Sequence, residues 1–363
     1  MHYITDFLVA GLVVYISFTN QLADNLIALL GTDANTKIAT EEAPQTAFLP
    51  SLPSFFGSGI IPDILLRSQP YQQANIISAP VPSTYTTDPL EALVNIYCTF
   101  VTKDTIRTTT GTGFFVHSDG VIMTNAHVAQ YLLLETTDLL GEADCVIRQG
   151  NPAVAKYRVE LLYLPPAWIQ KNAAVIDAAA PTGTGERDYA LLYVSESLAG
   201  EPLLARFPAL AVDTELLSHS IKGEAVEAAG YPATDFIANG ASTPLIPRKA
   251  ESRISELYTF GSNYADVISI GGSAVGAEGS SGGPIINSDG KAIGIIVTRG
   301  DDEADGKGSL RAITLSHIER TILEETGFSL AKNISGNLPF RAKIFNETLS
   351  PFLISILATE LKN

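Results

Sequence analysis

The most constraining feature of this 363-residue sequence is a long succession of short β-forming runs between residues 89 and 327. The runs are rich in Val, Ile, Tyr and Phe and are bounded by Gly, Asp, Asn and Ser, which is the pattern of short strands joined by turns. They comprise residues 94–101, 112–117, 121–126, 157–164, 189–194, 224–230, 284–287 and 292–297. No stretch alternates strand and helix regularly, so a parallel βαβ architecture is disfavoured. We therefore predict an all-β barrel fold.

Two Asp-Gly pairs mark tight turns between neighbouring strands. The segments HSDGV (117–121) and NSDGK (287–291) each place Asp-Gly between two strand candidates. Asp-Gly is a dipeptide that two-residue hairpin turns favour. Because the two hairpins have a similar form and lie far apart in the chain, we expect two related barrels.

A histidine follows the strand after the first hairpin, in the segment TNAHVA (124–129). A lone histidine is usually structural, and the chain has only five. The position of His127 is unusual, because it stands where a barrel strand passes into a loop. A general base must be held rigidly and still reach the substrate, so His127 is a candidate general base.

An aspartate stands at the head of a strand candidate within RDYALLYV (187–194). Asp is usually absent from such positions unless it caps a helix, forms a turn or pairs with another group. A carboxylate that orients a catalytic imidazole must be partly buried, ionised and hydrogen-bonded to the ring. Asp188 is therefore a candidate partner of His127.

A glycine-rich turn, EGSSGGP (278–284), offers a nucleophile. Glycines around a serine let the backbone turn sharply, so that the hydroxyl projects and nearby NH groups can stabilise an oxyanion. Two serines compete, and we choose Ser281 over Ser280 because Gly-Gly-Pro follows it directly. Most GSSGG strings are linkers, but this one leads straight into a strand candidate and the second hairpin.

Together, these segments resemble the trypsin-like serine peptidases, and most closely the HtrA (Deg) group. The resemblance rests on GTGFFVHSDGVIMTNAHVA, DYALLYV and GSSGGPIINSDGKAIGIIV, and on their order along the chain. It spans about residues 94–298 and includes AAGYP (228–232), which resembles a short turn of this group. The order His, Asp, Ser also matches the chymotrypsin arrangement.

The resemblance implies an all-β, chymotrypsin-like double β-barrel with the active site in the cleft between the barrels. In this arrangement Ser281 is the nucleophile, His127 the general base and acid, and Asp188 the orienting carboxylate of a serine endopeptidase. The NH groups of Gly279 and Ser281 form the oxyanion hole. No metal or organic cofactor is expected, because the triad and the oxyanion hole supply the chemistry.

The resemblance also assigns Val275, Val297 and Thr298 to the substrate pocket. An acidic residue six places before the serine would favour Lys or Arg at the cleaved position, but Val275 occupies that place. We therefore expect a preference for small or apolar side chains. Ser280 stands where the group usually has Asn, and no PDZ domain follows the peptidase, although many HtrA proteins carry one.

Composition divides the rest of the chain. The expected parts are an N-terminal anchor or signal at 1–30, a partly irregular linker at 31–88, the peptidase domain at 89–330 and a C-terminal tail at 331–363. The linker is dominated by Pro, Ser, Thr, Ala and Gln, which favour extended chain. Helical patterns predict a helix at 317–327 that ends on Gly327, and a short helix at 349–361.

The N-terminal apolar run predicts a retained membrane anchor. Residues 7–18 carry no charge, and residues 3–22 reach the length of about 20 that a spanning helix needs only by including Asp6 and Asn20. There is no basic n-region and no small-x-small cleavage site. We therefore expect an extracytoplasmic, membrane-anchored protein of the cell envelope or periplasm. A cleaved signal and a buried helix are the alternatives.

Charge and cysteine content restrict the partners. The formal net charge is −16, and phosphate binding needs clustered Lys and Arg, so we expect protein or peptide substrates and no nucleic acid. Homo-oligomerisation is left open. The two cysteines, Cys98 and Cys145, form no CxxC or Cys/His cluster, so a structural zinc site is not expected. They are either disulfide-bonded or two buried free thiols.

Two other functions are compatible with the sequence. The first is a catalytically silent pseudoprotease, which uses the same fold as a binding or chaperone module. The second is a structural, membrane-tethered protein whose barrel presents loops to partners. The structural reading predicts no reaction with a serine-directed phosphonate, whereas an active enzyme predicts one.

Overall fold

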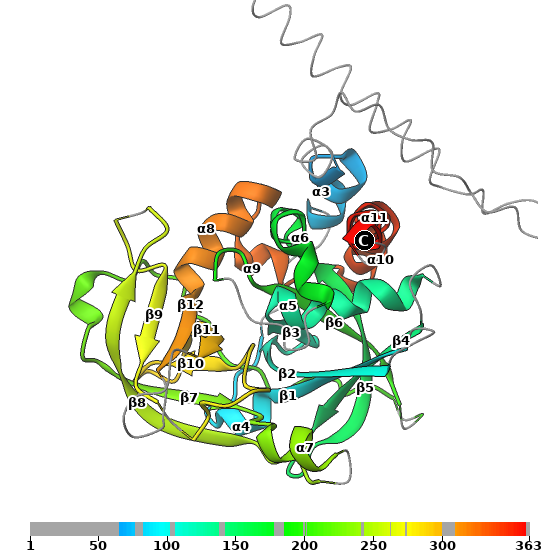
Figure 1. Cartoon of the computed structure of the whole chain (residues 1–363). Coiled ribbons are helices and arrows are strands. Elements are labelled where there is room, and N and C mark those ends of the chain that lie inside the picture. The colour runs from blue at the N-terminus through cyan, green and yellow to red at the C-terminus, as the bar shows by residue number, and fades with distance from the viewer. Residues whose placement is uncertain are drawn as a thin grey trace, which may run out of the picture.

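The computed structural model describes residues 65–76, 83–101, 106–137, 142–177, 185–198, 200, 202–240, 243–261, 263–272, 274–299 and 309–360. In these residues the strands form two closed β-barrels, and helices lie mainly on one side of them (Figure 1). The predicted double barrel and the C-terminal helices are thereby confirmed.

The first barrel has the strand order β1-β2-β3-β6-β5-β4. Its strands are β1 (Leu93–Val101), β2 (Ile106–His117), β3 (Val121–Thr124), β4 (Glu142–Gln149), β5 (Val154–Tyr163) and β6 (Ala190–Ser197). The first Asp-Gly turn joins β2 to β3, and Gly120 adopts a φ of +88° there. That left-handed conformation explains why a glycine ends this turn.

The second barrel repeats this plan with the order β10-β11-β12-β9-β8-β7. Its strands are β7 (Ala225–Gly230), β8 (Arg248–Tyr258), β9 (Val267–Ile270), β10 (Pro284–Ile286), β11 (Ala292–Arg299) and β12 (Leu310–Thr314). The second Asp-Gly turn joins β10 to β11. Both predicted hairpins are therefore present.

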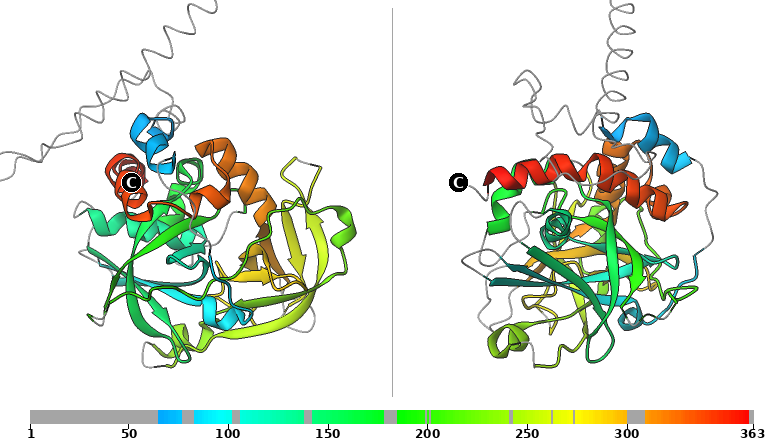
Figure 2. Two further views of the ribbon diagram at one scale, coloured as in Figure 1. Left: turned by 180° about the vertical axis from the view of Figure 1, so that it is seen from behind. Right: turned by 90° about the vertical axis from the view of Figure 1, so that its right-hand side faces the viewer.

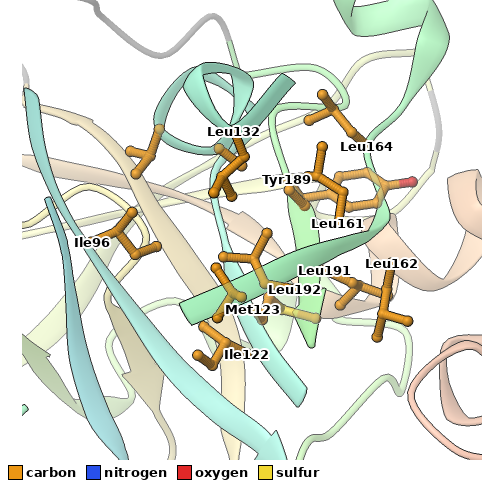
Figure 3. Packing of buried hydrophobic residues seen from close by; sticks show 14 of the residues in the cluster. Ile96, Ile122, Met123, Leu132, Leu161, Leu162, Leu164, Tyr189, Leu191 and Leu192 are labelled. Atoms are coloured by element: carbon orange, nitrogen blue, oxygen red, sulfur yellow. The ribbon is translucent and has the colours of Figure 1, made fainter. Parts of the chain in front are cut away.

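The core of the first barrel is filled by aliphatic and aromatic side chains from facing strands and from the helix that follows β3. Figure 3 shows Ile122 of β3, Leu161 of β5 and Leu192 of β6, which stand opposite one another in the strand register, within one buried cluster. Tyr189 lies in the same cluster and is fully buried. This packing fixes the ends of β3 and β6, where two of the predicted catalytic residues stand.

The two cysteines lie on neighbouring strands of the first barrel. Cys98 of β1 stands opposite Cys145 of β4, and their Cα atoms are 4.0 Å apart. They form a disulfide, and both residues are buried.

Helices occur in the loops of both barrels and in the C-terminal part. The loop helices are α4 (Pro89–Ala92), α5 (Ala126–Ala129), α6 (Pro166–Asn172) and α7 (Thr234–Asn239), with the 3₁₀ helices η1 (Gln130–Thr136), η2 (Ala173–Asp177) and η3 (His219–Ile221). The C-terminal helices are α8 (Leu315–Thr326), α9 (Leu330–Asn333), α10 (Leu338–Thr348) and α11 (Ser350–Glu360). Helix α8 ends as predicted, because Gly327 adopts a left-handed cap with φ 79°.

The last two helices lie on the first barrel, whereas α8 contacts β11 and β12 of the second. Helix α10 contacts β5 and β6, and α11 contacts α6, η1 and η2. Both views in Figure 2 show the red C-terminal helices beside the green strands and helices of the first barrel. Within the segment expected to be a linker, residues Gln69–Ile76 form helix α3, which packs on α10. The side chain of Gln72 also donates to the carbonyl of Thr326 at the end of α8 (3.2 Å). The final part of that segment therefore belongs to the folded body.

The predicted N-terminal anchor, with its apolar run at 7–18, lies outside the described residues. Among the helices that the structure does describe, none has the length and apolarity to cross a bilayer.

Candidate active site

His127 stands just beyond the end of β3, where the chain turns into α5. Strand β3 is fully buried and ends at Thr124, two residues earlier than the predicted run, because Asn125 is already the N-cap position of the short helix α5. The Thr124 hydroxyl donates to the Thr112 carbonyl on β2 (2.7 Å). The histidine is therefore carried by a rigid strand end, and only 4% of it is exposed.

Asp188 contacts His127 at two points. Its Oδ1 accepts the backbone NH of His127 (2.9 Å), and its Oδ2 lies 2.8 Å from the ring Nδ1. Asp188 is completely buried, and its backbone carbonyl accepts a hydrogen bond from the Asn125 side chain (2.9 Å). A buried carboxylate needs such donors, and they fix both the carboxylate and the ring.

The serine turn adopts a shape that only glycines permit. Gly279 and Gly282 have φ values of +92° and +89°. A Cβ on Gly282 would lie 1.9 Å from the Thr112 carbonyl oxygen, and one on Gly283 would lie 2.2 Å from the Ala229 carbonyl oxygen. The turn is therefore pressed against both barrels, between β2 and β7.

The two adjacent serines have different environments. Ser280 is 1% exposed, and its hydroxyl has no hydrogen-bond partner among the described residues. Ser281 is partly exposed and lies at the wall of a pocket. This difference favours Ser281 as the nucleophile.

Two backbone NH groups of the serine turn remain available. The NH groups of Gly279 and Ser281 donate to no acceptor in the part of the chain that the structure describes. The Glu278 carbonyl, which could otherwise turn toward them, accepts the Ala233 NH instead (2.7 Å). Unpaired NH donors at this place are what an oxyanion hole requires.

Thr112, which the sequence reasoning did not single out, holds this turn from the first barrel. Its hydroxyl donates to the Gly279 carbonyl (2.7 Å) and accepts the Tyr231 NH (2.9 Å). Its own NH donates to the Ser281 carbonyl (2.7 Å). The residue lies inside the GTGFFVH segment, but nothing in that string distinguishes it from the other threonines of β2.

Ser281 and His127 line the same pocket, which has a volume of about 430 Å³. Gly279 lines it as well. The other lining residues are Tyr97, Thr108, Thr109, Thr110, Val128, Tyr131, Phe236, Ile237, Gly240 and Glu278. The pocket offers apolar and hydroxyl-bearing walls beside the candidate nucleophile.

The Ser281 hydroxyl is not bonded to His127 in this structure. It donates to the backbone carbonyl of Val297 at 3.3 Å, and no hydrogen bond joins it to the imidazole, although both residues are described. The hydroxyl must therefore rotate toward the ring before a proton can pass between them.

The three residues expected in the substrate pocket lie in or beside the second barrel. Val275 is completely buried in the core of that barrel, and its side chain borders Gly230. Val297 of β11 is also buried, and its carbonyl accepts the Ser281 hydroxyl. The side chain of Thr298 lies outside the described part. Neither Val275 nor Val297 lines the 430 Å³ pocket.

Comparison with known proteins agrees with this geometry. The family model of the trypsin-like peptidase domain matches residues 111–295, a span that contains all three candidate catalytic residues. No curated protein matches the chain.

Several solved structures are similar over most of their length. A mutant of Rv3671c from M. tuberculosis in its inactive form is 18% identical, with 69% of this chain and 96% of that one covered and a TM-score of 0.38. The active form of the Rv3671c protease is 20% identical over 69% and 89%, with a TM-score of 0.39. Deg5 is 18% identical over 64% and 89%, with a TM-score of 0.41.

Proposed function

This chain belongs to the trypsin-like peptidase family and is a serine protease, and we propose that His127, Asp188 and Ser281 form its catalytic triad. The observation that carries the proposal is the double contact of Asp188 with His127 beside a pocket that also contains Ser281. The partly exposed hydroxyl of Ser281 and the free NH groups of the serine turn add to it.

The proposed reaction proceeds through an acyl-enzyme. The Ser281 oxygen attacks the scissile carbonyl while its proton passes to Nε2 of His127, and Asp188 stabilises the resulting imidazolium. The π-electron pair of the carbonyl moves onto the carbonyl oxygen. This oxyanion accepts hydrogen bonds from the NH groups of Gly279 and Ser281. When this pair returns, the C–N bond breaks and His127 protonates the leaving amine. Water then repeats the sequence and releases the acid.

We propose unfolded or exposed protein segments as the substrates. The expected preference for small or apolar side chains at the cleaved position gains no support from Val275, which lies in the core of the second barrel and does not line the pocket. A specific likeness to the HtrA group remains part of this proposal.

We also propose that the peptidase acts outside the cytoplasm on an N-terminal tether. The uncharged run at 7–18 motivates the tether, and the Cys98–Cys145 disulfide is typical of an oxidising compartment. Fractionation of cells that make the full-length chain tests this: we expect intact protein in the membrane fraction. Intact protein in the cytosol contradicts the tether, and a shortened, released protein indicates a cleaved signal.

One observation favours the alternative of a catalytically silent pseudoprotease. The Ser281 hydroxyl donates to Val297 and not to His127. If this hydroxyl cannot rotate, the fold serves only for binding.

Cleavage of casein by the full-length chain tests the proposed function. We expect cleavage by the wild type, none by Ser281→Ala, and cleavage close to the wild-type rate by Ser280→Ala, the matched control one residue away. Cleavage by a clean Ser281→Ala preparation contradicts Ser281 as the nucleophile. An inactive wild type with intact folding favours the pseudoprotease.

A further inference from the structure

The residue before Asp188 has a backbone conformation that a side chain disfavours. Arg187 has a φ of +59°, and among the described residues it is the only one other than glycine with a positive φ. The left-handed region brings Cβ close to the next carbonyl oxygen, so such residues are uncommon. They persist where the surroundings enforce them, often at active sites. The contacts of Arg187 therefore need to be traced.

Helix α8 holds the Arg187 side chain. The guanidinium pairs with the carboxylates of Glu325 and Glu324, and the latter contact is 3.1 Å. The Glu325 side chain is only 8% exposed, and the buried hydroxyl of Tyr163 also donates to it. Burial raises the pKa of Glu325, while the contacts with Tyr163 and Arg187 oppose that rise. The buried carboxylate of Glu325 thus has two partners, the guanidinium of Arg187 and the phenol of Tyr163, and little contact with solvent.

The same helix binds the residue after Asp188. The hydroxyl of Tyr189, which is fully buried, lies 3.0 Å from the hydroxyl of Thr321. Because Thr321 donates its proton to the His317 carbonyl (3.0 Å), Tyr189 is the donor in this pair. Thr321 and Glu325 are four residues apart and therefore lie on the same face of α8.

The backbone between these two contacts turns tightly at Asp188. The NH of Tyr189 donates to the Arg187 carbonyl (2.9 Å), and the NH of Asp188 donates to the Gly185 carbonyl (3.5 Å). In such a turn the left-handed φ of Arg187 sets the direction in which the side chain of Asp188 projects from the backbone. Helix α8 directly follows β12 of the second barrel (Figure 1), so it links that barrel to the turn.

We propose that Arg187 and Glu325 are positioning residues, which act through a clamp formed by the Glu325–Arg187 and Thr321–Tyr189 contacts. The two contacts fix the residues directly before and after Asp188, and they thereby keep the Asp188 carboxylate in hydrogen-bonding distance of His127. This inference rests on the proposed function and adds a role for α8, which lies beyond the residues matched by the family model.

Two substitutions of Arg187 distinguish the effect of its backbone conformation from the effect of its ion pair. Arg187→Gly and Arg187→Ala both remove the guanidinium, but only glycine adopts a φ of +59° freely. We expect kcat for peptide hydrolysis to be about tenfold lower in Arg187→Ala than in Arg187→Gly, with KM equal within about twofold. Equal kcat values in the two variants contradict the inference.

A matched pair on α8 tests the other half of the clamp. Glu325→Gln keeps the shape of the buried carboxylate and removes its charge, so we expect kcat to fall by about 10- to 100-fold with little change in KM. Glu324→Gln removes the exposed partner of the same arginine, and its effect on kcat is expected to stay within about twofold. If Glu325→Gln does not fold, Tyr189→Phe replaces it, since it deletes a single hydroxyl and should still lower kcat.

Proton NMR of the His127 Nδ1–H provides a readout that needs no turnover. A proton held between Nδ1 and a carboxylate resonates at low field, and we expect Glu325→Gln to shift or broaden that signal while Glu324→Gln preserves it. If the wild type cleaves nothing but its signal depends on Glu325 in this way, the proposed function fails and the clamp stands. If Glu325→Gln leaves both the signal and kcat unchanged, the clamp is wrong.

Discussion

The Asp188 carboxylate binds His127 through both of its oxygens, one on the backbone NH (2.9 Å) and one on the ring Nδ1 (2.8 Å). The backbone contact fixes where the carboxylate lies, and the ring contact fixes how the imidazole is turned. With Nδ1 engaged, Nε2 is the ring nitrogen left to exchange a proton with a substrate or a nucleophile.

Asp188→Asn tests the charge of this pair. The amide preserves the size of the side chain but removes the negative charge and changes which ring tautomer is stable. We expect kcat to fall by about 10⁴-fold while the melting temperature changes little. Peptide hydrolysis and thermal unfolding provide the two measurements. Asp119→Asn, in the turn between β2 and β3, is the control: Asp119 pairs with Arg206 and, within the described part of the chain, has no hydrogen bond or ion pair with His127, so the variant should keep normal activity.

Gly282→Ala tests the shape of the serine turn. The new Cβ would meet the Thr112 carbonyl oxygen at 1.9 Å, and the backbone has a φ of +89°. We expect loss of activity and a decrease in unfolding free energy of several kcal/mol, measured by urea denaturation; each strained backbone residue alone costs about 1–3 kcal/mol.

Gly290→Ala is the control for this experiment. Gly290 has a similar φ of +75°, but nothing lies within 4 Å of its added Cβ. It should therefore show the backbone cost and retain activity. Equal effects of the two substitutions would mean that the contact with Thr112 is unimportant.

Thr112→Val tests the link from the first barrel to the serine turn. The substitution keeps the shape but leaves the Gly279 carbonyl and the Tyr231 NH without their partner. We expect kcat to fall by about tenfold or more and stability to fall by about 1–3 kcal/mol for each unpaired buried group. Thr348→Val, which removes a buried hydroxyl from helix α10, should reduce stability without affecting kcat.

Reduction of the Cys98–Cys145 disulfide should destabilise the protein. The bridge joins residues 47 positions apart, and loss of a native disulfide typically costs about 2–5 kcal/mol. Urea denaturation with and without a thiol reductant measures this. A Cys98→Ser/Cys145→Ser double variant serves as the control, since its stability should not respond to the reductant. A wild type that does not respond either would contradict the bridge.

Local sequence patterns predicted the double barrel because its most buried strands and its tight turns carry strong signals. Strand β8 was missed for the opposite reason: it reads RKAESRISELY, and only Ile254 in it is fully buried. A strand with most of its side chains in water lacks the run of apolar residues that marks its neighbours. Strands β9 and β12, of four and five residues, were missed because neither is joined to a neighbouring strand by a short Asp-Gly turn like those that mark the equally short β3 and β10.

The sequence predicted only those residues of the candidate site that belong to a recognisable local motif. For Ser281 and His127, the residues next to them in the sequence already indicate their role. Arg187 and Glu325, by contrast, are 138 residues apart, and neither the left-handed φ of the one nor the burial of the other is visible in the letters around it. Contacts between distant segments set both properties, so they became apparent only in the folded chain.

The most direct test of the central claim is the reaction of the full-length chain with a fluorophosphonate probe, followed by mass spectrometry of the labelled peptide. An ordinary serine hydroxyl reacts poorly, so rapid labelling reports a serine activated by its histidine. We predict one probe molecule bound at Ser281, normal labelling of Ser280→Ala, and no labelling of Ser281→Ala or His127→Ala. Failure of the folded wild type to react, or a label on Ser280, would contradict the assignment of Ser281 as the activated nucleophile.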